Sequence, residues 1–344
     1  MTFQSAIRVR DYEPTDDSDA LELEARCPQG QAFRIVFARS SFHRRTAGFG
    51  EARLVCAWRG DRLVAIGGGA IKPIRWDGRA TMGLLLYDFR VDPAYRREGV
   101  ARHLTETLID WAKSRAEIGY AFAVGDNRAI QVMARQWIGA DTAPAFDLLT
   151  YPAHRGAETA AISDIAAHEV RERHLRSLGP RPLECGSDGA LGSPQRLASW
   201  SLPGVEPGGC SVWTTRDVFE EVLIGLPFAL RAASWALGGT TARRLGLPHV
   251  PRLGEHLRSW MLFDLFSRDG AAARQLVAAV ARRARERAID YCHVVLPPGS
   301  PLVEVLWRDV PKPFAPVLPF TIMARTIAGR PLALPAPAID PRDI

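Results

Sequence analysis

The feature that most constrains the fold is an unbroken succession of strand, tight turn and helix over residues 80–115. Residues 80–91 (ATMGLLLYDFRV) are mostly apolar, which predicts a buried strand. Asp92 and Pro93 end it, since proline cannot continue a hydrogen-bonded ladder. Apolar side chains then recur at helical spacing: Val100, Leu104, Leu108, Trp111 and Ala112. This succession predicts a sheet with an amphipathic helix packed against it.

The flanking residues extend this unit into a mixed α+β sheet. Strands are predicted at residues 6–11, 53–58, 63–73, 120–124 and 146–151, and helices within residues 20–41 and 127–137. The order is strand, helix, three strands, helix, strand, helix and strand. Because a single helix joins residues 80–91 to residues 120–124, these two strands are predicted to be parallel neighbours.

The second half of the chain repeats part of this pattern. Leu262-Phe263-Asp264-Leu265 precedes a long helical stretch and an apolar strand, as Leu86-Tyr87-Asp88-Phe89 does in the first half. We therefore predict a tandem of one fold, with chance likeness of two αβ segments as the alternative. The predicted parts are residues 1–152, residues 153–330 and a loose proline-rich tail over residues 331–344. An apolar segment, residues 218–237, is predicted to be helical.

Composition excludes several classes of protein. The 344 residues are 47% apolar and 24% charged, as expected for two globular domains. Five widely spaced cysteines without a CxxC pair argue against a disulfide framework or a zinc site, so no metal is expected. The N-terminus lacks the apolar region of a signal peptide, and no apolar stretch has a comfortable membrane-spanning length. We expect a cytoplasmic protein that binds neither nucleic acid nor membrane, with a homodimer left open.

The turn after residues 80–91 has the chemistry of an anion site. The first amides of a helix lack internal partners and lie at the positive end of the helix dipole. Such a turn is suited to phosphate oxygens. Gly99 allows a ligand to approach the backbone, Ala101 keeps the next turn small, and the neighbouring arginines add positive charge. A structural turn without a ligand is the alternative.

Residues 91–101, Val-Asp-Pro-Ala-Tyr-Arg-Arg-Glu-Gly-Val-Ala, resemble the Arg/Gln-x-x-Gly-x-Gly/Ala signature of the GNAT superfamily of N-acyltransferases. The match is Arg96-x-x-Gly99-x-Ala101, and Val91-x-Pro93-x-Tyr95-Arg96 resembles the usual lead-in. The resemblance covers residues 6–151. It implies a GNAT fold, a central mixed β-sheet flanked by helices, here in two tandem GNAT-like domains.

The resemblance also implies acetyl-CoA or another acyl-CoA as co-substrate. Turn amides would hold the pyrophosphate, and the end of the long strand would lie beside the pantetheine. Asn127 resembles an asparagine near the pantetheine arm, although a simple helix cap would look the same. The cofactor-binding residues implied in this way are Phe89, Arg90, Val91, Arg96, Arg97, Glu98, Gly99, Val100, Ala101 and Asn127.

The implied reaction is direct attack of an amine on the thioester, with strand amides stabilising the oxyanion. A base must remove a proton from the ammonium. Asp88 is the candidate catalytic residue, with a structural or substrate-anchoring carboxylate as the alternative. Many members of the superfamily also have a tyrosine that protonates the thiolate. Met133, Ala134 or Arg135 stands at its place here.

The expected function is therefore N-acyl transfer from acyl-CoA to an amine of a small molecule. The alternatives are a non-catalytic acyl-CoA-binding protein, or a transferase that uses an acyl carrier protein or a protein amine. In the second half, Ser267 stands where the signature arginine would be, and only Gly270-x-Ala272 remains of the signature. We expect that half to shape the substrate cleft or a dimer interface.

Overall fold

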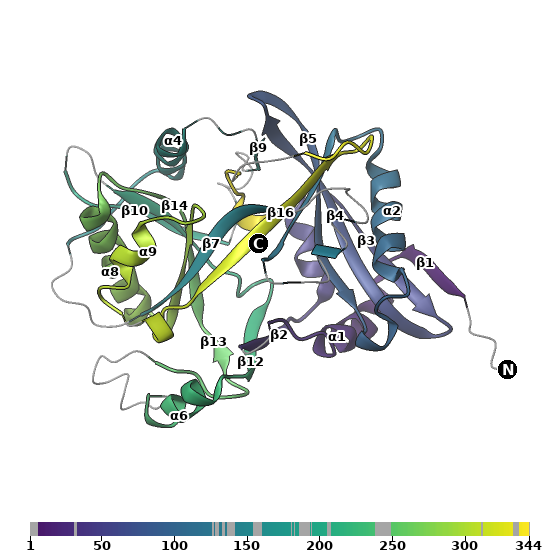
Figure 1. The fold of residues 1–344 in the computed structure, drawn as a ribbon, viewed down its shortest axis with the longest axis horizontal. Helices are drawn as coiled ribbons and strands as arrows, with labels where there is room; N and C mark the ends of the chain where they lie inside the picture. The colour runs from purple at the N-terminus through teal and green to yellow at the C-terminus, as the bar shows by residue number, and fades with distance from the viewer. Residues whose placement is uncertain are drawn as a thin grey trace.

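The computed structural model describes residues 6–343 except 31–32, 126, 128–130, 133–134, 136–141, 154–159, 180, 182, 186–192, 194, 205–207, 238–248, 311 and 333–336. Thirteen strands of the described residues form one mixed sheet (Figure 1). From edge to edge the strands are β1 (Ile7–Asp11), β3 (Glu51–Arg59), β4 (Arg62–Trp76), β5 (Arg79–Val91), β6 (Ile118–Val124), β16 (Val317–Thr326), β7 (Ala143–Pro152), β15 (Tyr291–Leu296), β14 (Ser259–Phe266), β11 (Gly209–Trp213), β10 (Arg196–Ser201) and β8 (Ser163–Asp164). The short strand β9 (Leu183–Glu184) pairs with β4 outside this path.

The middle of the sheet is built by exchange of strands between the two halves of the chain. The last strand, β16, pairs with β6, with Ile322 opposite Phe122. Conversely, β7 pairs with β15, with Thr150 opposite His293. In Figure 1, β7 and β16 cross the centre of the molecule side by side. The α+β class and the mixed sheet are thus confirmed, while the division into domains at residue 152 stays a prediction.

Helices cover the sheet through apolar stripes. The helix α2 (Val100–Ala112) buries Val100, Leu104 and Leu108 against β3, β4 and β5, at the spacing of one helix face. In the second half, α8 (Gly270–Glu286) packs on β14 and β15. The other helices are α1 (Asp17–Ala25), α4 (Ala167–Leu178), α6 (Phe228–Leu237) and α9 (Leu302–Leu306). None of the described helices is long and apolar enough to cross a membrane.

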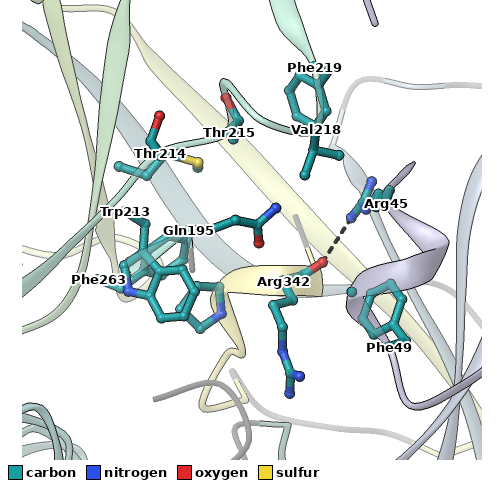
Figure 2. Close-up of a pocket in the computed structure, with 13 residues that line it drawn as sticks. Arg45, Phe49, Gln195, Trp213, Thr214, Thr215, Val218, Phe219, Phe263 and Arg342 are labelled. Carbon is teal, nitrogen blue, oxygen red and sulfur yellow. Dashed lines mark hydrogen bonds between the residues drawn. The ribbon is translucent and has the colours of Figure 1, made fainter. Parts of the chain in front are cut away.

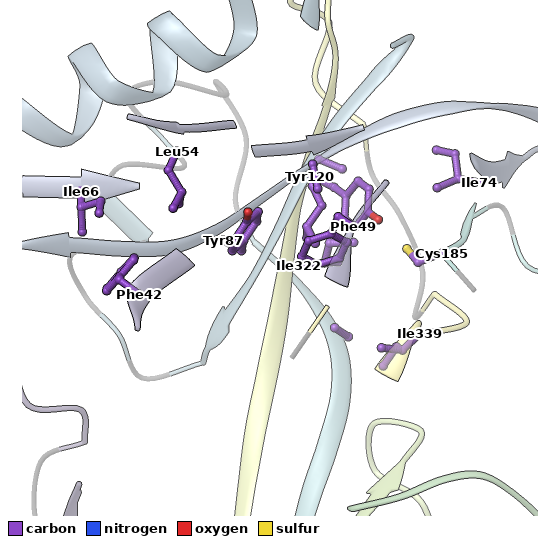
Figure 3. Close-up of a cluster of buried hydrophobic side chains, with 14 of the residues drawn as sticks. Phe42, Phe49, Leu54, Ile66, Ile74, Tyr87, Tyr120, Cys185, Ile322 and Ile339 are labelled. Carbon is purple, nitrogen blue, oxygen red and sulfur yellow. The ribbon is translucent and has the colours of Figure 1, made fainter. Parts of the chain in front are cut away.

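One hydrophobic cluster contains side chains from both halves of the chain (Figure 3). Phe42, Tyr87 and Tyr120 come from the first half, and Phe263 and Ile339 from the second. All five side chains are buried. Because burying apolar area is the main favourable term in folding, this shared core holds the two halves together.

Three expectations from the sequence were wrong. Within residues 20–41 the helix α1 ends at Ala25, and β2 (Arg34–Ala38) is a strand that pairs with β12 (Glu220–Gly225). The apolar segment 218–237 is therefore strand β12 followed by α6, and β12 also pairs with the short strand β13 (His256–Leu257). The tail is not loose throughout, since Ala338 and Asp340 are 1% and 0% exposed. Tertiary pairing decided each case, and local pattern does not encode it.

Candidate functional site

The end of the central strand β5 carries a bulge. The register between β4 and β5 shifts between Ile66 and Gly68, which lie opposite Arg90 and Tyr87. Within the bulge, Asp88 has a φ of 53°, in the left-handed region that non-glycine residues seldom adopt. The recorded pairing of β5 with its parallel neighbour β6 ends at Leu85. The bulged end of β5, which includes Phe89 and Val91, therefore lies beyond the stretch paired with β6.

The turn that follows β5 has the backbone of an anion-binding loop. Arg97 and Gly99 have φ of 69° and 79°, and α2 begins at Val100. Positive φ values at alternate residues turn successive amides toward one side, which favours an anion. Gly99 is the N-cap of α2 and has no side chain that could cap the helix. The first amides of α2 are consequently left for a ligand.

The side chains of this turn are exposed, and one of them bonds to the backbone: Nε of Arg96 donates to the Val91 carbonyl at 3.3 Å. Arg96, Arg97 and Glu98 are exposed. The Glu98 carboxylate lies 2.9 Å from Nη2 of Arg59, the last residue of β3, and forms an ion pair with it. At the start of the turn, Asp92 accepts a hydrogen bond from the Ala94 amide at 3.0 Å, which fixes the chain direction. These contacts preorganise the turn that the sequence predicts to hold phosphate.

The Asp88 carboxylate is buried in a cluster of arginines. Nη1 of Arg39 donates to Oδ2 of Asp88 at 2.8 Å, and Nη1 of Arg45 donates to Oδ1 at 3.0 Å. Nη2 of Arg90 lies 3.8 Å from Oδ1. The cluster extends to Glu24 on α1, whose oxygens lie 2.8 Å from Arg39 and 2.6 Å from Arg90. It joins α1 and the segment before β3 to the bulge of β5.

These contacts decide the protonation state of Asp88. Burial by itself would raise its pKa, but Arg39, Arg45 and Arg90 outweigh burial and hold the pKa far below its ordinary value of 3.8. Asp88 is therefore ionised at neutral pH and is a weak proton acceptor, because an efficient general base has a pKa near the working pH. The geometry favours the structural role, one of the alternatives that the sequence analysis left open.

Two predicted cofactor residues have specific surroundings. The Arg90 side chain is 8% exposed and bound to Glu24, so its backbone is the part available to a ligand. Asn127 follows β6; its amide donates to the Val124 carbonyl at 3.0 Å, and its carbonyl accepts from the Gln131 amide at 3.1 Å. Of the residues at the expected tyrosine position, Met133 and Ala134 lie outside the described residues.

A small cleft of about 30 Å³ lies between the halves, next to this cluster (Figure 2). Arg45 borders it and connects it to Asp88. The second half supplies aromatic walls, including Trp213 and Phe219. The remaining lining residues are Gly48, Phe49, Gln195, Thr214, Thr215, Val218, Met261, Phe263, Pro341 and Arg342. The walls of the cleft are mainly apolar, but the space is far smaller than the roughly 300–1,000 Å³ of small-molecule sites.

The C-terminal segment forms one wall of the cleft. Nη2 of Arg45 donates to the Arg342 carbonyl at 3.0 Å, as the dashed line in Figure 2 marks. In the same segment, Asp340 binds Lys72, and Asp343 lies 2.5 Å from Nζ of Lys72. Tyr120 donates to the other oxygen of Asp343 at 3.1 Å. Burial raises the pKa of Asp343 to about 6, against the opposing effect of Lys72.

The second half has the same bulge but a different turn. Asp264 on β14 has a φ of 54°, and the register of β11 with β14 shifts beside it. Arg171 of α4 binds the Asp264 carboxylate. The following helix α8 is capped by Asp269, whose carboxylate accepts from the Ala272 amide at 2.8 Å. That helix end already carries its own anion.

Sequence reasoning missed Arg39 and Arg45, the two principal partners of Asp88. Several arginines lie between residues 34 and 45, and local pattern offers no reason to prefer Arg39 and Arg45 over the others. A lone aspartate in an apolar strand is itself a signal that cationic partners exist, because a buried carboxylate needs them. That signal does not name the partners. Among the described residues no group of three or more potential ligands is placed to hold a metal ion.

The first half of the chain matches a known family. Residues 19–137 match the sequence profile of the Acetyltransferase (GNAT) family. That range contains the bulge at Asp88, the turn at Gly99 and Asn127. No curated protein sequence matches the chain.

Solved structures resemble the whole chain in fold. A GCN5-related N-acetyltransferase from Kribbella flavida is 16% identical, with a TM-score of 0.51 over 94% of this chain and 72% of that one. Saccharomyces cerevisiae N-myristoyltransferase with bound myristoyl-CoA is 10% identical, with a TM-score of 0.57 over 100% of this chain and 83% of that one. At these identities the likeness is one of fold. It extends across both halves of the sheet.

Proposed function

We propose that this chain transfers an acyl group from acyl-CoA, most simply acetyl-CoA, to an amine of a small molecule, because residues 19–137 match the Acetyltransferase (GNAT) family. The observation that carries the proposal is the start of α2. Its amides are uncapped behind Gly99, and Arg96 and Arg97 lie exposed beside them. This is where a pyrophosphate gains most from the helix dipole and from added positive charge.

In this proposal the thioester lies at the bulged end of β5. With the pyrophosphate on residues 96–101, the pantetheine would lie along Phe89, Arg90 and Val91. These three residues follow the part of β5 that pairs with β6. Backbone groups of that stretch would meet the acyl carbonyl and stabilise its oxyanion. Asn127, just after β6, would contact the pantetheine from the side of that strand.

The acceptor amine would approach the thioester from the side of the Asp88 cluster on which Arg45 lies. The amine nitrogen forms the new bond to the acyl carbon and loses a proton to solvent, the carbon–sulfur bond breaks, and CoA leaves as the thiolate. The amine must reach the carbonyl unprotonated, because only its lone pair is nucleophilic. The arginine cluster around Asp88 disfavours an ammonium nearby and so helps the amine to lose its proton to solvent. Asp88 holds these arginines in place in this scheme.

The test uses the full chain. A thermal-shift screen of acyl-CoAs finds the donor, and mass spectrometry with pooled amines, together with a thiol assay, finds the product. We expect one acyl-CoA to stabilise the protein and to release CoA in proportion to acylated amine. Binding without CoA release from any amine would contradict catalysis and leave an acyl-CoA-binding protein.

A further inference from the structure

Exposed apolar side chains gather at one end of the molecule. Of the eight large apolar side chains that are exposed among the described residues, five belong to the small sheet of β2, β12 and β13 and to the residues beside its strands. In Figure 1 this sheet and α6 lie below the large sheet, with α6 outermost. A gathering of exposed apolar side chains marks an interaction surface. The five are Phe33, Ile224, Phe228, Trp235 and Leu253, and together they form what we call the α6 surface.

The helix α6 has its aromatic side chains on the outside. Phe228 and Trp235 are each 86% exposed, and they lie seven residues apart, so two helical turns bring them to one face. Arg231 is exposed on the same face. On the opposite face, Leu230 packs against a buried cluster and Ser234 is 4% exposed. An amphipathic helix normally buries its large apolar side chains, so the outer face is left for a partner.

The other three side chains continue this surface along the end of the small sheet. Phe33 directly precedes β2, which pairs with β12. Leu253 precedes Gly254, whose amide donates to the Leu223 carbonyl of β12 at 2.7 Å. Ile224 follows Leu223 in the same strand. All three therefore lie where the chain leaves β12 and enters α6.

The exposed charges beside these apolar side chains are positive. Arg34, Arg231 and Arg252 are exposed, and each is adjacent to a member of the α6 surface in the sequence or on the helix face. Neither residues 25–50 nor residues 222–254 contain an aspartate or a glutamate. The α6 surface thus combines apolar side chains with positive charge.

The carboxylates at the borders of these ranges have partners of their own. Glu255 accepts a hydrogen bond from the Arg252 amide at 2.9 Å and lies 2.8 Å from Nε2 of His249. Glu220, at the other end of β12, accepts from Nε of Arg216 at 3.1 Å. These contacts leave the positive charge beside α6 largely uncompensated.

From these observations we infer that the α6 surface docks on an anionic lipid bilayer. Phe228 and Trp235 would enter the boundary between headgroups and acyl chains, and Arg231 would face lipid phosphates. Aromatic side chains and arginine suit this boundary, because each has an apolar part and most have a polar end. The sequence-based expectation of no membrane rested on the lack of a spanning segment, and a helix that lies on a membrane needs none. The inference does not depend on the proposed function.

The chemistry of the α6 surface favours lipid over two other partners. Nucleic acid calls for basic residues along a stripe, whereas Ile224 and Leu253 add aliphatic groups here. A second copy related by a two-fold axis would place the same patch against itself, so its arginines would meet arginines. An anionic bilayer offers both an apolar layer and negative charge.

The experiment measures sedimentation of the full chain with lipid vesicles. One kind of vesicle contains phosphatidylcholine alone, and the other contains about 30% phosphatidylglycerol, which gives it a negative surface potential. We expect binding to the anionic vesicles to be at least about tenfold tighter, since several arginines contribute. The difference should shrink at high salt, because salt screens exposed charges.

Substitutions on the surface locate the contact. The double variant Phe228→Ser with Trp235→Ser should weaken binding at least about tenfold through lost apolar area. Leu253→Ser and Leu197→Ser form a matched pair, because these leucines are 45% and 43% exposed and Leu197 lies on β10 of the large sheet. The first should weaken binding severalfold and the second should not. Circular dichroism checks that each variant is folded.

A second pair of variants tests the role of charge. Arg231→Gln should weaken binding to anionic vesicles about fivefold, the contribution of one arginine near such a surface. Arg102→Gln, at an exposed arginine of α2, should leave binding unchanged.

Three results would overturn the inference: no vesicle binding, equal binding to both kinds of vesicle, or binding that survives the double substitution. If the protein bound no vesicles but formed a dimer that the double variant dissociates, the α6 surface would belong to a second copy of the chain. None of these measurements requires acyl transfer, so the proposed function stands or falls separately.

Discussion

The helices α2 and α8 follow equivalent strands but begin in opposite ways. Gly99 leaves the amides of α2 uncapped, whereas the Asp269 carboxylate caps α8 and fills the place of an anion. The strands before them share the same bulge, with φ of 53° at Asp88 and 54° at Asp264. The two bulged strands are thus followed by helices that begin differently, and we propose a phosphate site only at the start of α2.

The bulge aspartates also differ in their partners. Asp88 has three arginines within 4.0 Å, whereas Arg171 is the recorded ion-pair partner of Asp264 in the described residues. The first bulge therefore contains a charge network beside a cleft, and the second a simpler pair. The four predictions that follow test this difference between the halves.

The largest effect is expected on stability. Asp88→Asn leaves three buried guanidinium groups with one carboxylate fewer, so it should lower the free energy of unfolding by about 3–5 kcal/mol, the usual cost of breaking a buried pair. Asp264→Asn should cost less, because fewer cations lose a partner. Urea denaturation followed by circular dichroism measures both. Equal losses would mean that Asp88 contributes no more to the free energy of unfolding than Asp264 does.

Asp88 should contribute to the pH dependence of the free energy of unfolding. A carboxyl whose folded pKa lies below its ordinary value of 3.8 stabilises the protein above that value. This stabilisation is lost as pH falls toward the folded pKa, at about 1.4 kcal/mol per pH unit for one proton. Denaturation between pH 5 and pH 3 should show a shallower loss in Asp88→Asn than in the wild type. An unchanged slope would contradict the low pKa.

The third prediction exchanges the helix caps. Gly99→Asp places a carboxylate at the start of α2, where α8 already has one, and should weaken CoA binding about tenfold or more by repulsion. In Asp269→Ala the helix α8 loses its cap, at a cost of about 1 kcal/mol in stability, without gaining CoA binding. Isothermal titration with CoA and thermal denaturation report on the two changes. CoA affinity that survives Gly99→Asp would remove the turn from the cofactor site.

The smallest effect is expected from exposed arginines. Arg97→Ala should weaken CoA binding severalfold, and the loss should shrink at high salt because exposed charges are screened. Arg268→Ala, in the corresponding turn of the second half, should leave CoA affinity unchanged. Titrations at two ionic strengths give both comparisons. A similar loss from Arg268→Ala would point to a second phosphate site.

The sequence predicted the first half well because its elements are local patterns. Alternating or apolar runs predicted β3, β4, β5 and β6, and helical spacing predicted α2, all of which are present. The turn at Gly99 could be predicted because the pattern Arg96-x-x-Gly99-x-Ala101 places a glycine where the backbone has a positive φ. Local chemistry was sufficient in these places.

Elsewhere the outcome depended on partners that are distant in the sequence. The segment containing β2 has helical signals, yet it pairs with β12 of the other half. Arg39 and Arg45 reach Asp88 across more than 40 residues, and Lys72 meets Asp340 across 268. No periodicity encodes such contacts, since they are selected by the assembled fold.

The exchange of strands β7 and β16 between the two halves has a consequence for biosynthesis. During translation β6 leaves the ribosome long before β16, so the first half exposes an open sheet edge until nearly the whole chain is made. In the meantime β7 must stay free of the adjacent edge of β6 that β16 will later occupy. A chain cut between its halves would leave each fragment without the strand that closes its own sheet, and mixed fragments should associate to complete one another.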